Sequence, residues 1–387
     1  MTFDEPNLVA DAELLLVATL GARLGLERLV NTTVHLRGRV GGALPGRKVL
    51  SLVHAMAAGG SHIDDADVLR SGATGSALGH RVMPPSTLGT FLRAFTFGQI
   101  RQLDRVLGEA LRRAWALGAG PGSAPLVIDL DSTICEVCGK AKHGAGFGYT
   151  KKLGYHPLIA TRAWTGELLH VRMRKGAANT QRGAVRFIEE LVARVRRAGA
   201  SGDLFMRFDS GFWSNTTIAT LERLGVSYTM GVRMIKAVVA AVEDISEFAG
   251  PRSSTRPTAR PRSPSATTRG AASSGAAPGD GRLAIRDLKE GASLEHVPSG
   301  NFLANSAWLV CAALAHNLIR WTAMLGDITE EERLIVARTV RTRFLSVPGR
   351  LVSRSGRPTL RAPLESPWAG AFARALELLR ALPPVPV

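Results

Sequence analysis

Two short apolar segments that end in acidic residues constrain this chain more than any other feature. Residues 126–133 read Leu-Val-Ile-Asp-Leu-Asp-Ser-Thr and carry Asp129 and Asp131, and residues 205–211 read Phe-Met-Arg-Phe-Asp-Ser-Gly and carry Asp209. An apolar run of this length, bounded by polar residues, is typical of a buried strand. Two such strands lying side by side would bring Asp131 and Asp209 within reach of one divalent cation. Carboxylates are ligands that Mg²⁺ accepts, so the sequence predicts a magnesium site here.

The segments around these acids follow a definite order. After a first strand at 125–131, the hydrophobic pattern predicts strands at 154–164 and 168–174, a helix at 179–198, a strand at 203–208, a helix at 214–224 and a strand at 226–233. Three antiparallel strands, followed by parallel strands that alternate with helices, form the ribonuclease-H-like pattern. In such a sheet the first and fourth strands are neighbours, so Asp131 is expected beside Asp209.

The rest of the chain divides into regions of different composition. From Pro251 to Gly281 there is no Leu, Ile, Val, Met, Phe, Trp, Tyr or Cys, so this stretch cannot bury enough surface to fold. We expect an α/β protein with a ribonuclease-H-like mixed sheet, an all-helical N-terminal region and a helical C-terminal extension. The expected regions are a DNA-end-binding helical part at 1–120, the first part of the catalytic core at 125–245, a disordered low-complexity segment at 246–282, core-completing helices at 283–346 and a basic tail with a closing helix at 347–387.

The charge of the chain indicates the kind of partner. The formal net charge is +17 at pH 7, and an excess of this sign and size favours nucleic acid over membrane. Residues 303–325 are apolar but are interrupted by Asn305, His316, Asn317 and Arg320, which predicts a buried helix and no membrane span.

Cysteine usage and the N-terminus bear on the compartment. Cys135, Cys138 and Cys311 are too few for a disulfide framework, so we expect reduced thiols. Asp4 and Glu5 stand where a signal peptide would have basic residues. We therefore expect a cytoplasmic protein.

One enzyme class matches the first acidic segment locally. In haloacid-dehalogenase-type phosphatases an apolar run ends in Asp-x-Asp-x-Thr. By that pattern Asp129 would be the nucleophile, Asp131 the acid and base, and Thr133 a phosphate contact. That fold requires a parallel sheet linked by helices. Here a predicted hairpin follows instead, so the phosphatase is the alternative interpretation.

A second resemblance covers most of residues 125–325. Its motifs are Asp131–Thr133, Gly154–Leu158, Arg174 with Gly176 and Asn179, Arg207–Phe212, Ile285–Lys289, Asn301–Asn305 and Leu314–Leu318. The series resembles the DDE insertion-sequence transposases of the cut-and-paste type, in particular the family numbered thirteen-eighty. This resemblance implies a ribonuclease-H-like core in which Asp131 and Asp209 hold Mg²⁺, with Asp129 as the alternative to Asp131. It also implies strand cleavage and transfer at the inverted-repeat ends of a transposon, by a homodimer on double-stranded DNA.

The third acid of that family does not match. The family pattern places Tyr, Arg, Glu and Lys on one helix, with the Glu seven residues before the Lys. Lys289 fits the Lys position with Arg286 one turn before it, and the resemblance implies that both contact nucleic acid. The Glu position is then Arg282, a cation where a metal ligand belongs. Glu290 would lie about 80° round the helix and about 12 Å along it from position 282, which makes it a poor substitute.

The chain departs from the family pattern up to the end of the low-complexity segment and matches it again after that point. We hypothesise that roughly residues 245–282 are read in a shifted frame or joined across a deletion, and that the original frame resumes near Leu283. Translating the other two frames of the gene would test this idea, because one of them must yield Tyr-x-x-Arg-x-x-x-Glu. On this hypothesis the chain is an impaired transposase, and the non-enzyme alternative is a non-catalytic DNA-binding remnant.

Overall fold

The computed structural model describes residues 4–385, apart from 140, 149–150, 233–235, 237–238, 240–284, 290–293, 295, 329–336, 346 and 355–356. The segment expected at 246–282, together with Arg282 and Glu290, lies outside the described residues. Residues 329–336, within the region expected to hold core-completing helices, lie outside them as well.

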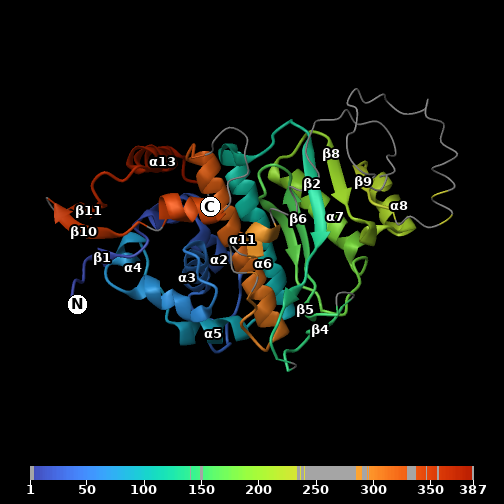
Figure 1. Ribbon diagram of the computed structural model, residues 1–387, viewed down its shortest axis with the longest axis horizontal. Helices are drawn as coiled ribbons and strands as arrows, with labels where there is room; N and C mark the ends of the chain where they lie inside the picture. Colours follow the sequence, from blue (N-terminus) through green and yellow to red (C-terminus); the bar gives the residue numbers. More distant parts are fainter. Residues whose placement is uncertain are drawn as a thin grey trace.

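A five-stranded mixed sheet forms the centre of the α/β part (Figure 1). Its strands are β2 (Leu126–Ser132), β6 (Leu158–Arg162), β7 (Leu168–Arg172), β8 (Leu204–Phe208) and β9 (Ser227–Met230), in the order β7-β6-β2-β8-β9. β6 runs antiparallel to β2 and β7, whereas β8 runs parallel to β2 and β9. The predicted mixed sheet, in which the first and fourth long strands are neighbours, is confirmed.

Helices α7 (Ala184–Ala198) and α8 (Asn215–Arg223) alternate with the parallel strands, as expected. α7 begins later than the predicted residue 179 because the Arg174 guanidinium holds the preceding segment in turns. Its Nη1 donates to the carbonyl oxygens of Asn179 at 2.9 Å, Thr180 at 3.0 Å and Arg182 at 2.9 Å. These carbonyls therefore accept from a side chain, and the Asn179 carbonyl also accepts a turn bond from the Arg182 N–H at 3.2 Å, so the helix does not start here.

The strand predicted at 154–164 is divided between two sheets. β5 (Leu153–Tyr155) pairs with β3 (Cys135–Glu136) and β4 (Gly146–Phe147) in a small sheet, and β6 starts at Leu158 in the central one. Pro157 lies at the junction and has no N–H for a ladder bond. Gly176 packs tightly against the small sheet, where a Cβ would collide with the carbonyl oxygens of Gly154 and Gly146.

The N-terminal region is mainly helical, as predicted. It contains β1 (Leu8–Val9), a 3₁₀ turn (Ala12–Leu14), α1 (Leu15–Arg23), α2 (Leu26–Thr33), α3 (Pro45–Ala57), a 3₁₀ segment (Ile63–Arg70), α4 (Thr74–Ala77), α5 (Pro85–Arg93) and α6 (Phe97–Ala114). Buried side chains of these helices and of the central sheet form one continuous hydrophobic cluster. The expectation of an entirely helical region was wrong at β1, because its hydrogen-bonding partner lies at the other end of the chain.

Helix α11 (Phe302–Leu325) runs beside α6, between the N-terminal helices and the sheet (Figure 1). In the described part of the chain it is the one helix that is long and apolar enough to cross a membrane, but 89% of its most apolar window is buried inside the protein. Its polar side chains bond the β6–β7 hairpin: Asn317 pairs with the N–H of Leu168 at 2.7 Å and with its carbonyl at 2.8 Å, and His316 Nε2 contacts the Gly166 carbonyl at 2.8 Å.

The C-terminal elements are α12 (Ala337–Val340), a π-helical turn (Arg341–Leu345), β10 (Gly349–Arg354), β11 (Arg357–Arg361) and α13 (Ala369–Ala381). β10 lies between β1 and β11 in a three-stranded antiparallel sheet at one end of the long axis of the molecule (Figure 1). This sheet joins the two ends of the chain. The boundaries of the regions expected from the sequence stay predictions.

Candidate active site

Asp131 and Asp209 occupy neighbouring positions at the same end of two paired strands. The parallel register of β2 and β8 pairs Leu130 with Phe208, and each acid is the next residue on its strand. Asp209 keeps an extended backbone, with φ −78° and ψ 172°, before the short 3₁₀ turn Ser210–Phe212. Adjacent strands of a sheet lie about 4.8 Å apart. The fold therefore brings together the two acids that the sequence singled out.

The ion pair between Asp129 and Arg207 shows which face of the sheet carries Asp131 and Asp209. Asp129 lies opposite Arg207 in the register, and Arg207 Nη2 donates to the Asp129 carboxylate at 2.7 Å across the two strands. Residues two apart on a strand share a face. Asp131 and Asp209 are thus on the same face as this ion pair, each two residues closer to the carboxyl end of the strand.

The same ion pair contradicts the phosphatase alternative. Its nucleophile would be Asp129, yet both carboxylate oxygens of Asp129 accept hydrogen bonds from Arg207. A parallel sheet linked throughout by helices is also absent from the described part of the chain, where the β2–β6 and β6–β7 pairs are antiparallel. The haloacid-dehalogenase interpretation of Asp129 and Asp131 is wrong.

A buried histidine lies against the acidic strand end. His156 is fully buried, its Nδ1 contacts the Ala178 carbonyl at 2.7 Å, and its Nε2 contacts Ser132 Oγ at 3.0 Å. Burial lowers the pKa of His156, while the nearby charge of Asp209 opposes that shift. A neutral ring that donates through Nδ1 to the carbonyl accepts the Ser132 hydroxyl through Nε2. This contact fixes the side chain of the residue that follows Asp131.

The sequence analysis gave His156 no role of its own and missed this contact. The only local signal was the motif Gly154–Leu158, in which Pro157 ends one strand and His156 precedes the break. The partner, Ser132, is 24 positions away. No spacing rule connects the two.

Lys289 contacts the segment that follows the same strand. Residues 285–289 are helical, and Lys289 Nζ donates to the Ile134 carbonyl at 2.8 Å. Asp287 anchors this turn, because its buried carboxylate bonds the Arg320 guanidinium of α11 and accepts from the Ala337 N–H at 2.8 Å. Arg286 is exposed. A nucleic-acid-binding role for Lys289 and Arg286 stays a prediction.

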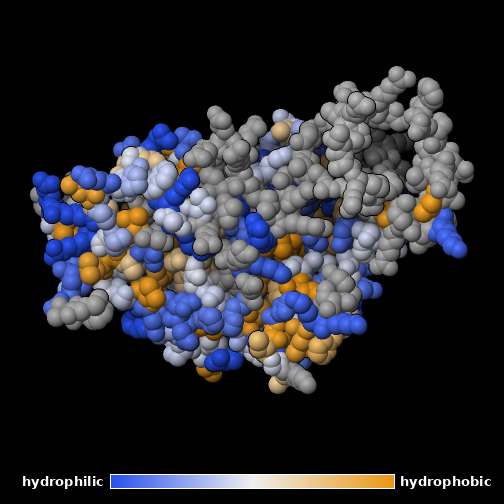
Figure 2. Space-filling model, in the orientation of Figure 1, coloured by the Kyte–Doolittle hydropathy of each residue, from blue (hydrophilic) through white to orange (hydrophobic). Residues whose placement is uncertain are grey.

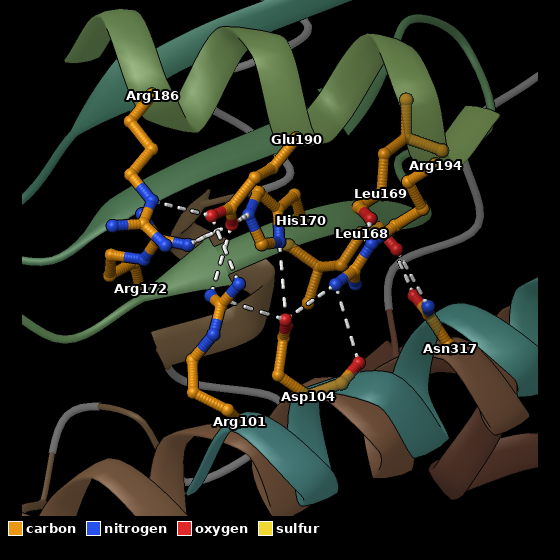
Figure 3. A network of polar contacts seen from close by, with 10 residues as sticks. All are labelled: Arg101, Asp104, Leu168, Leu169, His170, Arg172, Arg186, Glu190, Arg194 and Asn317. Atoms are coloured by element: carbon orange, nitrogen blue, oxygen red, sulfur yellow. Dashed lines mark hydrogen bonds and ion pairs between the residues drawn. The ribbon is translucent and has the colours of Figure 1, made fainter. Parts of the chain in front are cut away.

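A second acidic cluster lies elsewhere, among α6, β7 and α7 (Figure 3). Donor atoms of Asp104, His170 and Glu190 lie within 4.8 Å of one another, a spacing that could suit a metal ion. The cluster is already filled by cations: Arg194 bonds Asp104 at 2.7 Å, and the guanidinium groups of Arg101, Arg172 and Arg186 all bond Glu190.

Four guanidinium groups outnumber the two carboxylates of this cluster, so a metal cation would have to displace bound positive charges. Burial alone would raise the pKa of Asp104, but Arg194 and His170 outweigh it and hold that pKa far below its usual range. We therefore interpret the cluster as a structural ion-pair network that ties α6 to β7 and α7.

Replacing Asp104 with Asn is expected to destabilise the protein by about 2–3 kcal/mol at neutral pH, because buried Arg194 would lose its counter-charge. The pKa of Asp104 is lower in the folded than in the unfolded state. Its contribution is therefore complete above the unfolded pKa near 3.8 and is lost as the pH falls below that value. Thermal unfolding between pH 3 and 7 measures both effects.

The exposed pair Asp67–Arg70 supplies the matched control, and Asp67→Asn should cost less than about 1 kcal/mol. Equal losses for the two variants would contradict the buried-network interpretation.

Comparison with known proteins identifies the family of the chain. The family profile for the transposase DDE domain, group 1, matches residues 1–273. The solved structures that match include a piggyBac transposase synaptic complex with hairpin DNA. It is 13% identical, with a TM-score of 0.45, and the match covers 86% of this chain and 79% of that one. No curated protein matches. The profile spans well over half of the chain, so the protein belongs to the group 1 family of transposase DDE domains.

Proposed function

We propose that this transposase binds the ends of its own insertion sequence as duplex DNA, and that Asp131 and Asp209 hold Mg²⁺ for strand cleavage and transfer. The observation that carries the proposal is the β2–β8 register, with both acids next to each other on one face. The family membership and the charge of +17 agree with a DNA substrate.

The donor set fits a magnesium ion in part. Asp131 and Asp209 offer carboxylate oxygens from adjacent strands, the ligand type that Mg²⁺ prefers. Asp129 is excluded from the set by its bonds to Arg207. Bound metal would polarise the scissile phosphate and lower the pKa of an attacking water. The chain's own contribution is to hold both carboxylates on a rigid sheet, with His156 fixing Ser132 beside Asp131.

Lys289 and Arg286 are the proposed contacts of this site to the DNA backbone. The Lys289 ammonium is only partly buried, and it is held at Ile134, three residues beyond Asp131. Asp287 fixes this turn against α11, so the positive charge is positioned by the buried core. A fixed cation at the strand end would orient a phosphate next to the carboxylates.

The missing third carboxylate limits the proposed activity. Residue 282 is Arg where the family pattern has Glu, and the family match ends at residue 273, before this position. We propose that the chain retains DNA binding but cleaves poorly. A non-catalytic remnant that competes with an intact transposase for the same ends is the second candidate, and Arg282 favours it. In either case we expect a homodimer acting in the bacterial cytoplasm, at the nucleoid.

Gel shifts and nicking assays on the DNA that flanks the gene test the proposal. Binding should weaken steeply with salt, by on the order of 10³-fold or more between 50 and 200 mM, because several phosphate contacts release counterions. Nicking in Mg²⁺ should be weak, and EDTA should abolish it. Absence of salt-sensitive binding would refute the proposed function, whereas binding without any nicking would support the remnant.

A further inference from the structure

The β10–β11 hairpin carries arginines directly opposite one another. Its register pairs Arg350 with Arg361 and Arg354 with Arg357, and Val352 with Thr359 between them. Arg350 and Arg354 are four residues apart on one strand and therefore share a face. Arg361 is paired with Arg350 and lies on that face as well. All three side chains are exposed to solvent.

This arrangement costs the isolated protein free energy. Like charges directly opposite each other in an antiparallel pair are destabilising. Glu5 bonds Arg350 at 2.9 Å, and within the described part of the chain no acidic side chain forms an ion pair with Arg354 or Arg361. The exposed face thus holds more positive charge than the protein itself neutralises.

The opposite face of the hairpin attaches it to the protein. Leu351 and Leu360 are paired on that face and are partly buried. A side chain at Gly349 would run into Ala12 and Leu360, so the N-terminal segment packs closely here. β1 adds a third strand on the β10 side. The arginine face is therefore presented outward on a supported ribbon.

We propose that this arginine face of the β10–β11 ribbon is a second contact to duplex DNA, separate from the acidic strand ends. The inference rests on the proposed binding of DNA by the chain. A two-stranded β-ribbon fits the major groove of B-form DNA, whose rims are phosphates. Arg350 and Arg354 lie about 13 Å apart along the strand, about the rise of four base pairs. The narrow major groove of duplex RNA does not admit such a ribbon.

The ribbon and the acids lie in different parts of the molecule, so we assign them different roles in DNA binding. β10 and β11 lie at one end of the long axis, whereas β2 and β8 lie in the other half of the molecule (Figure 1). Strongly hydrophilic residues gather at the ribbon's end of the surface (Figure 2). Contacts here would bind the duplex away from the scissile phosphate. Losing them should therefore lower the affinity for DNA without altering the cleavage step.

The test combines Arg350→Gln, Arg354→Gln and Arg361→Gln in the full chain, with a fluorescent mixed-sequence DNA duplex as the probe. Loss of these phosphate contacts should reduce affinity at least about tenfold near 0.1 M salt and lower the slope of log K against log salt by about 2–3. The control removes the same charge from exposed arginines of α6, α7 and α8 (Arg105→Gln, Arg197→Gln and Arg223→Gln) and should change affinity less than about threefold.

A second measurement excludes a simple folding defect. Because Arg350 and Arg361 repel each other, Arg361→Gln should leave the melting temperature unchanged or raise it. Unchanged binding by the triple variant, equal losses in the control, or equal affinity of the wild type for duplex RNA would each overturn the inference. Failure of the wild type to bind any duplex would instead refute the proposed function.

Discussion

Exchanging Arg282 for Glu should raise Mg²⁺-dependent nicking of transposon-end DNA by about a hundredfold or more, the largest effect that we expect on activity. The residue stands at the position of the family's third acid. A guanidinium there repels metal cations, whereas a carboxylate would complete the set begun by Asp131 and Asp209. Single-turnover cleavage of a labelled duplex, with and without EDTA, measures the gain.

Three further variants make this result specific. Arg282→Gln removes the positive charge without adding a ligand, so it should give only a small part of the gain. Asp131→Asn or Asp209→Asn, introduced together with Arg282→Glu, should return nicking to background, because each removes an oxygen ligand from the proposed site. If Arg282→Glu brings no gain, the missing carboxylate at residue 282 is not the only defect in the segment before residue 283. If the gain survives loss of Asp131, the proposed site is wrong.

Replacing Glu167 with Leu should destabilise the fold by about 4–5 kcal/mol, the largest effect on stability. Glu167 is fully buried, and its carboxylate accepts hydrogen bonds from Trp115 Nε1 at 3.1 Å, Trp321 Nε1 at 2.6 Å and Arg162 Nη1 at 3.1 Å. These donors come from the end of α6, from α11 and from β6. Leu would leave two buried indole N–H groups without this acceptor, and the Arg162 guanidinium would lose its counter-charge.

Glu167→Gln is the matched control. Burial raises the pKa of Glu167 even though Arg162 and both tryptophans favour the ionised form, so the charge itself is not what the site stabilises. A neutral amide has nearly the same shape and can keep the acceptor oxygen that Trp115 and Arg162 share, but its NH2 would then face the Trp321 N–H. It should therefore destabilise the fold less than Leu does, by at least about 1 kcal/mol. Equal melting temperatures for the Leu and Gln variants would show that these hydrogen bonds contribute little to stability.

Much of the sheet could be predicted because its signals are local. Each long strand is a short apolar run, and the alternation with helices fixes which strands are parallel neighbours. Asp131 and Asp209 follow from this order, since both end strands that must pair. The division of residues 154–164 between two sheets was not predicted, because it depends on how Gly176 packs against Gly154.

The surroundings of the acids depend on contacts between distant parts of the chain. Asp129 and Arg207 are 78 positions apart, and Lys289 and Ile134 are 155 apart. No characteristic spacing in the sequence marks either pair. From the sequence alone Asp129 was therefore still a candidate nucleophile, and only the strand register showed its partner Arg207. Likewise, β1 has only two residues and becomes a strand because β10 lies beside it.

The sequence by itself determined the long strands that carry the acids, which acids end them and how much positive charge the chain carries, because these are properties of short segments and of composition. Only the tertiary structure decided which acids are already neutralised, which histidine supports the strand end and which arginines face outward together. Those outcomes depend on register and on packing between distant segments, where a side chain's partner is set by the fold and not by its neighbours in sequence.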